Sequence, residues 1–183
     1  MIVFLLGFMG AGKSYLGRQL AKKTCSEFID LDEELVKQTG MTINEIFERY
    51  GEDHFRKLET EMLHKISNDF KLRENKDNTK ESYCFLGCGG GTPCFNGNME
   101  WMNKHGITVW LNPSVIVLFS RLRNEQDERP LLKGLGDHEL MTFIENKLAE
   151  RRKFYDLSIV KLNDVNYSLT NILTNIKDAQ KFF

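Results

Sequence analysis

Eight residues near the start of the chain have the types and the spacing of a phosphate-binding loop. The stretch GFMGAGKS at positions 7–14 fits the pattern G-x-x-x-x-G-K-[ST]. Gly7 and Gly12 leave room for a polyphosphate to lie against the main chain. Lys13 adds a positive charge for the outer phosphates, and the hydroxyl of Ser14 can ligate Mg²⁺. The pattern therefore predicts a nucleotide site with a divalent cation.

The segments on either side of this loop predict the two elements that must position it. Residues 2–6 (IVFLL) form a short apolar run, as expected of a buried parallel strand. In residues 15–23, Leu16, Leu20 and Lys23 fall on one helical face. The free N–H groups of such a helix would point at the phosphates. A glycine-rich turn that matches the pattern by chance is the alternative, and the flanking strand and helix disfavour it.

Two aspartates end the next apolar segment, FIDLD at positions 28–32. Because side chains alternate along a strand, Asp30 and Asp32 are expected to face one site. One would lie near the metal and the other near a substrate hydroxyl, at the carboxyl end of the strand. The alternative is structural, with Asp32 capping a helix over residues 33–38. Asp32 can serve both purposes.

An arginine, a glutamate and a glycine triplet are further candidates for a site. Arg56 and Glu59 are three residues apart on a predicted helix and can pair. The plain alternative is a surface ion pair of little energetic weight. Gly89, Gly90 and Gly91 follow a predicted strand at 83–86, which indicates close approach of the main chain to a ligand. A floppy turn is the alternative there.

Composition bounds the class of protein. The chain has 183 residues, of which 41% are hydrophobic, and a formal charge of -1. These values favour one domain and give no sign of a nucleic-acid or membrane surface. No apolar run is long enough to span a membrane, and the first run lacks the features of a signal peptide. We expect a cytoplasmic protein whose four cysteines are ordinary reduced thiols.

Apolar strands alternate with amphipathic helices along the whole chain. This order predicts an α/β fold of three layers, like that of P-loop NTPases, with a five-stranded parallel sheet between helices. The predicted strands are residues 2–6, 28–32, 83–86, 107–111 and 157–162. Further helices are predicted over 43–50, past Gly51 to about 66, over 98–104 and 114–123, after Asp137, and over 168–181.

Two charged segments are predicted to lie outside this framework. Residues 71–82 (KLRENKDNTKES) have no apolar periodicity and are expected to form a polar surface insert. Residues 124–137 are charged and punctuated by glycine, which is typical of a mobile lid over an active site.

The remaining patterns narrow the kind of nucleotide-dependent protein. The D-x-x-G and N-K-x-D elements of GTPase switches are absent from the sequence. The chain is also short for a motor or a transporter ATPase. A compact ATP-dependent kinase for a small acceptor remains. Arg56, Arg129 and Arg151, on separate elements, suit an anionic acceptor, because guanidinium groups bind carboxylate and phosphate at two points.

Six motifs in this order resemble the shikimate kinase family over almost the full chain. They are GFMGAGKS at 7–14, DLD at 30–32, G-E-x-x-F-R-x-x-E at 51–59, GGG at 89–91, RPLL at 129–132 and E-R-x-x-x-Y at 150–155. The resemblance implies a single kinase domain that phosphorylates the 3-hydroxyl of shikimate with ATP. The segment at about 32–66 would supply the acceptor-binding helices.

The resemblance also implies a role for each matched residue. The ATP-binding residues would be Gly10, Ala11, Gly12, Lys13, Ser14, Tyr15, Arg121 and Arg129, with Arg123 as the alternative to Arg121. Mg²⁺, the implied cofactor, would be held by Ser14 and Asp30. Shikimate would be bound by Asp32, Arg56, Glu59, Gly89, Gly90, Gly91 and Arg151. The residues implied in catalysis are Lys13, Asp32 (the candidate base) and Arg129.

Two rival functions and three further expectations remain open. A kinase for another small acceptor, such as gluconate, would keep the loop but would not need Arg56 and Arg151 to converge on a carboxylate. A non-catalytic nucleotide sensor would tolerate loss of the acceptor site. We expect ATP and shikimate as the only partners, a monomer by default, and a Cys88 thiol that makes the site sensitive to thiol reagents.

Overall fold

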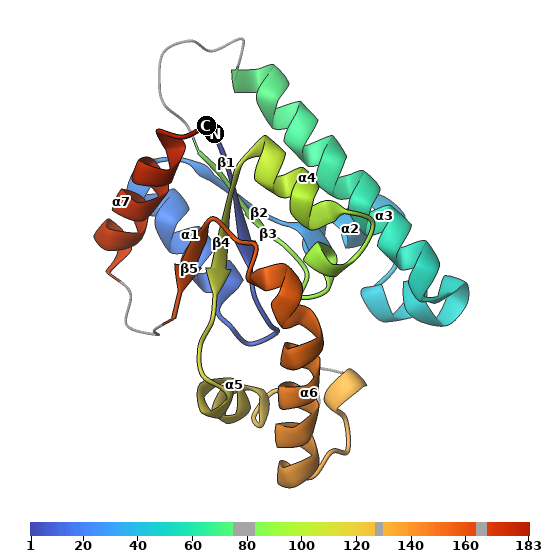
Figure 1. Cartoon of the computed structure of the whole chain (residues 1–183). Coiled ribbons are helices and arrows are strands. Elements are labelled where there is room, and N and C mark those ends of the chain that lie inside the picture. Colours follow the sequence, from blue (N-terminus) through green and yellow to red (C-terminus); the bar gives the residue numbers. More distant parts are fainter. Residues whose placement is uncertain (75–82, 127–129, 164–167) are drawn as a thin grey trace.

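The core of the protein is a parallel sheet whose strands run in the spatial order β2-β3-β1-β4-β5. A computed structural model describes residues 1–74, 83–126, 130–163 and 168–183. All strand pairs in it are parallel (Figure 1). The strands are β1 (Ile2–Leu6), β2 (Glu27–Asp30), β3 (Cys84–Gly87), β4 (Ile107–Leu111) and β5 (Val160–Leu162). The predicted fold class is confirmed.

Helices cover both faces of this sheet (Figure 1). The α-helices are α1 (Lys13–Thr24), α2 (Leu31–Thr39), α3 (Ile43–Glu74), α4 (Asn98–His105), α5 (Val115–Leu122), α6 (Asp137–Tyr155) and α7 (Leu169–Gln180). Single 3₁₀ turns lie at η1 (Thr92–Cys94) and η3 (Pro130–Leu132). Helices α1 and α7 pack on one face, and α2, α3 and α4 pack on the other.

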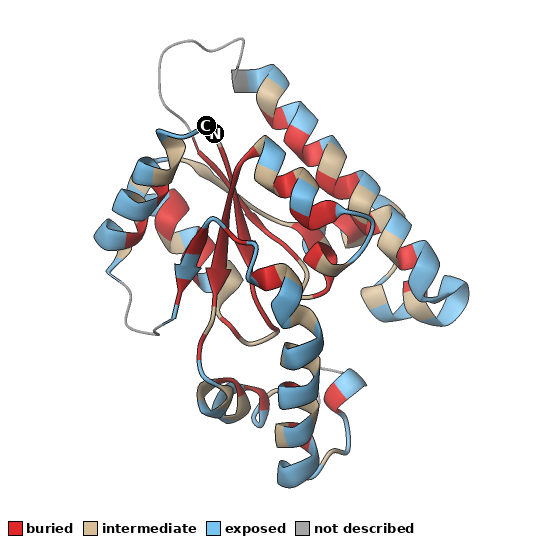
Figure 2. Cartoon of the chain, viewed as in Figure 1, coloured by how far each residue is buried: buried red, intermediate tan, exposed pale blue. Residues whose placement is uncertain are grey.

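The central strand β1 shows why a continuous apolar run makes a buried strand. Val3 and Leu5 belong to the core on the α1 side, whereas Ile2, Phe4 and Leu6 belong to the core on the α3 side. Every residue of β1 is buried, and the sheet is enclosed between the two helical layers (Figure 2). A parallel strand covered on both faces needs apolar side chains at every position.

Three helix starts differ from the predictions. Helix α2 is capped by Asp30, whose carboxylate accepts the N–H of Asp32 at 3.1 Å, so the predicted cap at Asp32 is wrong. The chain leaves the strand at Asp30, two residues earlier than predicted, and the cap moves with it. Helix α6 starts after Gly136, whose N–H bonds the Glu139 carboxylate at 2.8 Å, and Asp137 already lies inside the helix. Ser114 caps α5.

Helix α3 is longer than predicted and is broken where the sequence indicates. Gly51 interrupts it with φ of 80° and ψ of 174°, and Thr42 and Glu45 form a capping box at its start. Its last turn takes in residues 71–74, so this part of the predicted insert is helical. Arg73 pairs there with Glu27 of β2 at 3.0 Å, which ties the helix end to the sheet. The rest of the insert, 75–82, lies outside the described residues.

The described residues contain neither a membrane-spanning helix nor a cluster of metal-ligating side chains. None of the helices in them is both long enough and apolar enough to cross a membrane. Nor do three His, Cys, Asp or Glu side chains gather there in a group that could hold a metal ion. The thiols of Cys25, Cys84, Cys88 and Cys94 are free.

Candidate active site

The stretch 7–14 forms a loop between the end of β1 and the start of α1, as the sequence predicts. Gly7 adopts φ of 142°, and a Cβ atom there would lie 2.6 Å from the carbonyl oxygen of Leu111 in β4. Gly12 adopts φ of 97° immediately before α1. Residues that carry a side chain rarely adopt these backbone angles, so the loop needs glycine at both positions. The loop leads directly into α1, whose first residue is Lys13.

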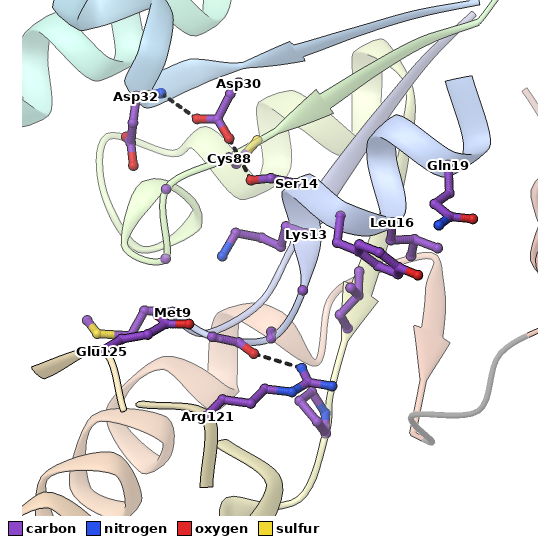
Figure 3. A pocket seen from close by; sticks show the side chains of 18 of the residues that line it. Met9, Lys13, Ser14, Leu16, Gln19, Asp30, Asp32, Cys88, Arg121 and Glu125 are labelled. Atoms are coloured by element: carbon purple, nitrogen blue, oxygen red, sulfur yellow. Dashed lines mark hydrogen bonds between the residues drawn. The ribbon is translucent and has the colours of Figure 1, made fainter. Parts of the chain in front are cut away.

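Lys13 and Ser14 carry the polar side chains of this loop. The ammonium group of Lys13 donates to the carbonyl oxygens of Gly7 at 2.9 Å and Phe8 at 3.1 Å, so it lies across the loop. The hydroxyl of Ser14 donates to Oδ2 of Asp30 at 2.7 Å (Figure 3). The loop is thereby joined to the end of β2, two strands away in the sheet.

A cavity of about 730 Å³ opens over the loop. This volume lies within the range of small-molecule sites in proteins. The phosphate loop lines one part of the cavity, and Asp32, Gly89 and Gly90 line another (Figure 3). Tyr15, Gln19, Pro113, Arg121 and Leu169 are also among the lining residues. The same cavity is therefore lined by the predicted nucleotide-binding residues and by part of the predicted acceptor site.

The two aspartates lie together, but not for the reason that the sequence indicates. Asp30 ends β2, whereas Asp32 lies in the first turn of α2, so strand alternation does not relate them. The pKa of Asp32 is raised to about 6, chiefly by burial and then by the nearby carboxylates of Glu59 and Asp30. Lys13 and Arg56 act in the opposite direction on that pKa. Asp32 is therefore a carboxyl group that changes its charge close to neutral pH.

Arg56 and Glu59 form a buried pair and not the surface ion pair that was the alternative. Nη1 of Arg56 donates to Oε2 of Glu59 at 2.9 Å, and the Glu59 side chain is fully buried. The other carboxylate oxygen of Glu59 accepts the hydroxyl of Thr92 at 2.5 Å. Nε and Nη2 of Arg56 both donate to Oε1 of Glu52, at 3.2 and 3.0 Å. The ring of Phe95 lies 4.3 Å from the guanidinium carbon.

The glycine triplet packs directly against these polar side chains. A Cβ atom on Gly89 would lie 2.6 Å from Oε1 of Glu59, and one on Gly91 would lie 2.6 Å from Nη2 of Arg56. A Cβ atom on Gly90 would lie 2.9 Å from Nη1 of Arg151. Real Cβ atoms essentially never come within 3.0 Å of another heavy atom. Glycine suits this turn because the polar groups of Glu59, Arg56 and Arg151 occupy the space that side chains would fill.

The arginines of the second half of the chain have different positions. Arg151, in the last turns of α6, lies against Gly90 with its guanidinium carbon 5.4 Å from the centre of the Phe8 ring. Arg121 donates to the carbonyl oxygen of Gly10 at 2.8 Å and lines the cavity. Arg123 instead pairs with Asp137 at 2.9 Å. Arg129, predicted to reach the phosphates, lies outside the described residues.

Two features of the site escape the sequence analysis. Tyr155 donates its hydroxyl to the carbonyl oxygen of Gly90 at 2.6 Å. Its position four residues after Arg151, on the same helix face, was the available signal. Cys88 contradicts the expectation of a reactive thiol, since it is 2% exposed and burial raises its pKa well above the ordinary value. A protonated, covered thiol is a poor target for thiol reagents.

Comparison with known proteins identifies the relatives of this chain. A sequence profile of the family "Shikimate kinase" matches residues 9–180. A shikimate kinase of Bacteroides fragilis is 43% identical over 153 residues, which cover 84% of this chain and 79% of the relative. One of Azobacteroides pseudotrichonymphae is 35% identical over 174 residues, with 95% and 96% covered.

Solved structures agree with these relatives. The shikimate kinase of Bacteroides thetaiotaomicron superimposes with a TM-score of 0.80 and 38% identity, covering 100% of this chain and 97% of the other. The enzyme of Acinetobacter baumannii, in complex with shikimate, gives 0.74 and 28%, with 99% and 89% covered. A gluconokinase of Sinorhizobium meliloti, at 0.50 and 15%, shares the fold alone. The chain belongs to the shikimate kinase family.

Proposed function

We propose that this protein transfers the γ-phosphoryl group of ATP to the 3-hydroxyl of shikimate. The products are shikimate 3-phosphate and ADP, on the route to chorismate and the aromatic amino acids. The observation that carries the proposal is the turn at Gly89–Gly91, which packs against Glu59, Arg56 and Arg151 beside the phosphate loop. The relative solved with shikimate supports the choice of acceptor.

The phosphate loop binds the nucleotide in this proposal. Backbone N–H groups from Gly10 to Tyr15 surround the phosphates, and Lys13 leaves its carbonyl partners to neutralise the transferred group. Arg121 is the arginine that contacts the adenine, since it borders the cavity and Arg123 does not line it. Arg129 is proposed to reach the phosphates when residues 124–137 close as a lid, which would exclude water from the reaction.

The side chains of Ser14 and Asp30 suit Mg²⁺. They place a hydroxyl and a carboxylate oxygen 2.7 Å apart next to the phosphate loop, and Mg²⁺ prefers oxygen ligands. When bound, Mg²⁺ neutralises charge that develops on the phosphates. Ser14 and Asp30 would hold it, with Asp30 acting either directly or through water.

The proposed acceptor site contributes two cations and one carboxylate, and of these three groups Asp32 is among the residues that line the cavity. Arg56 lies against Gly91 and Arg151 against Gly90, where their guanidinium groups can bind the carboxylate of shikimate. Asp32 accepts a hydrogen bond from the attacking hydroxyl once its carboxyl group is ionised. Because the transition state of phosphoryl transfer is loose, orientation by Asp32 contributes more than basic strength.

A coupled assay of ADP release with ATP and Mg²⁺ tests the proposal. The panel of acceptors is shikimate, gluconate and a nucleoside monophosphate, and we expect turnover of shikimate alone. Absence of ADP release with shikimate would end the proposal. A non-catalytic sensor would leave ATP affinity and melting temperature unchanged when shikimate is added, whereas an acceptor site raises the melting temperature.

Cytoplasmic location, a monomeric state, and the absence of nucleic-acid or membrane partners stay predictions. Light scattering on the purified protein, with and without both substrates, measures the oligomeric state directly. A mass of about 21 kDa is expected for a monomer, from the 21.3 kDa of the chain.

A further inference from the structure

Tyr155 is a fully buried side chain at the end of α6 for which the proposed reaction has no role so far. Its hydroxyl donates to the carbonyl oxygen of Gly90 at 2.6 Å, and its ring packs 5.5 Å from that of Trp110 in β4. Burial holds its pKa well above the ordinary value of a tyrosine, so the hydroxyl stays a donor at every physiological pH. A permanent donor is therefore aimed at the middle of the glycine turn.

The hydrogen bonds of the turn show what this donor does there. The carbonyl of Gly89 accepts the N–H of Thr92 at 3.1 Å, and that of Gly91 accepts the N–H of Cys94 at 2.8 Å. Both bonds are local and belong to the 3₁₀ turn η1. The carbonyl of Gly90 is instead bonded by a side chain from α6, 65 residues away. The carbonyl of Gly90 is thus held by Tyr155, whereas the carbonyls of Gly89 and Gly91 are held by backbone bonds within the turn.

Arg151 and Tyr155 meet Gly90 together. They are four residues apart on α6 and so lie on one face of the helix. One approaches the α-carbon of Gly90 and the other its carbonyl oxygen. A change in the tilt of the Gly90 peptide would therefore shift both the turn and the position of the Arg151 guanidinium.

We infer that Tyr155 is a positioning residue for the acceptor: its hydroxyl holds the Gly90 peptide and Arg151 in the arrangement that binds shikimate. This inference rests on the proposed function. Tyr155 does not touch the reacting atoms, and its effect is transmitted through Gly90 and Arg151. The loss of its hydroxyl should weaken shikimate binding without weakening ATP binding.

Tyr155→Phe removes the hydroxyl and keeps the ring, and Tyr83→Phe is its matched control. Tyr83 is also buried and donates to Gln180 at 3.3 Å. It precedes β3, however, whereas the glycine turn follows the other end of that strand. We expect Tyr155→Phe to raise the KM for shikimate about 3- to 10-fold, as loss of one buried hydrogen bond does, with an unchanged KM for ATP. Tyr83→Phe should change neither KM.

A double-mutant cycle with Arg151→Lys tests the route of the effect. If Tyr155 acts through Gly90 and Arg151, the double variant loses less than the product of the two single losses. A shikimate KM for Tyr155→Phe within twofold of the unaltered enzyme would overturn the inference, and so would an equal rise for Tyr83→Phe. Inactivity of the unaltered enzyme on shikimate would instead refute the proposed function, so the two failures are distinguishable.

Hydrogen exchange of the unaltered protein keeps the inference testable if Tyr155→Phe does not fold. The amides of Thr92 and Cys94, which donate to the carbonyls of Gly89 and Gly91, should exchange slowly before shikimate is added, because Tyr155 already holds the turn. Exchange as fast as that of an unstructured peptide, with slowing only after shikimate is bound, would contradict the inference.

Discussion

The two halves of the proposed site, one for the nucleotide and one for the acceptor, differ in how the chain supplies their residues. The nucleotide half is contiguous, since Lys13, Ser14 and the loop glycines lie within eight residues. The acceptor half is assembled from α2, α3, the turn after β3 and α6, between Asp32 and Arg151. The first half depends on local backbone conformation, whereas the second exists only once the sheet and its helices have packed.

The halves differ in their electrostatics as well. In the nucleotide half, the loop can offer backbone N–H groups and one ammonium group, that of Lys13, to a ligand. In the acceptor half, Glu59 is shared between Arg56 and Thr92, and its charge raises the pKa of Asp32. The effects of substitutions in the loop should therefore be additive, whereas the effects of substitutions in the acceptor half should depend on one another.

Lys13→Ala should have the largest effect and should be confined to the nucleotide half. Loss of a cation that stabilises charge in the transition state is expected to lower kcat about 10²- to 10³-fold. Steady-state kinetics in both substrates measure this loss. Lys22→Ala, on the exposed side of α1, is the control and should leave kcat unchanged. A loss below tenfold would mean that the ammonium group does not face the phosphates.

Arg56→Lys should show how strongly the acceptor half depends on geometry. An ammonium group cannot copy the two-point contact of a guanidinium, so we expect the KM for shikimate to rise about 10- to 100-fold. The KM for ATP should not change. Arg73→Lys removes the guanidinium that pairs with Glu27 at the far end of α3 and serves as the matched control. An unchanged KM for shikimate would remove Arg56 from the site.

Asp32 should make activity depend on pH near neutrality. With its pKa at about 6, kcat/KM for shikimate should fall about tenfold per pH unit below that value, because only the ionised carboxyl group accepts the bond from the hydroxyl. Asp32→Asn should lower activity and flatten this limb of the profile. A limb that persists in Asp32→Asn would assign the titration to another group.

The same pKa has a consequence for stability with a defined sign. The folded state keeps the proton of Asp32 up to pH of about 6, whereas the unfolded chain releases it near 3.8, so stability falls as the pH rises through this window. At pH 8 the penalty is about 2–3 kcal/mol, and Asp32→Asn should recover part of it in urea unfolding. Equal stability of the two proteins at pH 5 and pH 8 would contradict this account.

Glu52→Gln should have the smallest effect and would sharpen the account of Arg56. Oε1 of Glu52 accepts hydrogen bonds from Nε and Nη2 of Arg56. The carboxylate of a substrate can bind the same two nitrogens, so Glu52 competes with it. Because the Glu52 side chain is 54% exposed, the bond is weak, and we expect its loss to lower the shikimate KM about two- to threefold. Glu48→Gln, one turn earlier and also exposed, is the control. A raised KM would show that Glu52 holds Arg56 for the substrate.

The contrast between the halves also explains what the sequence alone could predict. Strand, loop and helix at residues 2–24 follow from local pattern, and the structure has them where predicted. The fifth strand is shorter than predicted because Leu157 and Ile159 are half exposed and only Val160–Leu162 pair with β4. Apolar side chains outside the sheet look the same in sequence as those inside it.

The contacts that complete the acceptor half could not be predicted from local pattern. The bond from Tyr155 to Gly90 spans 65 residues, and that from Thr92 to Glu59 spans 33. The order β2-β3-β1 brings Asp30 next to the turn after β3, which no spacing in the chain indicates. Such neighbours depend on the connections between strands, so a single sequence shows the residues but not their partners.

Helix α6 links the glycine turn to the core on the α1 side of the sheet. Its 19 residues span about 28 Å at 1.5 Å per residue (Figure 1). Leu140 and Ile144 are fully buried in that core, and Tyr155 in the last turn bonds the carbonyl oxygen of Gly90. Since Arg56 and Glu59 come from α3 on the other face, the acceptor half of the proposed site depends on helices from both layers.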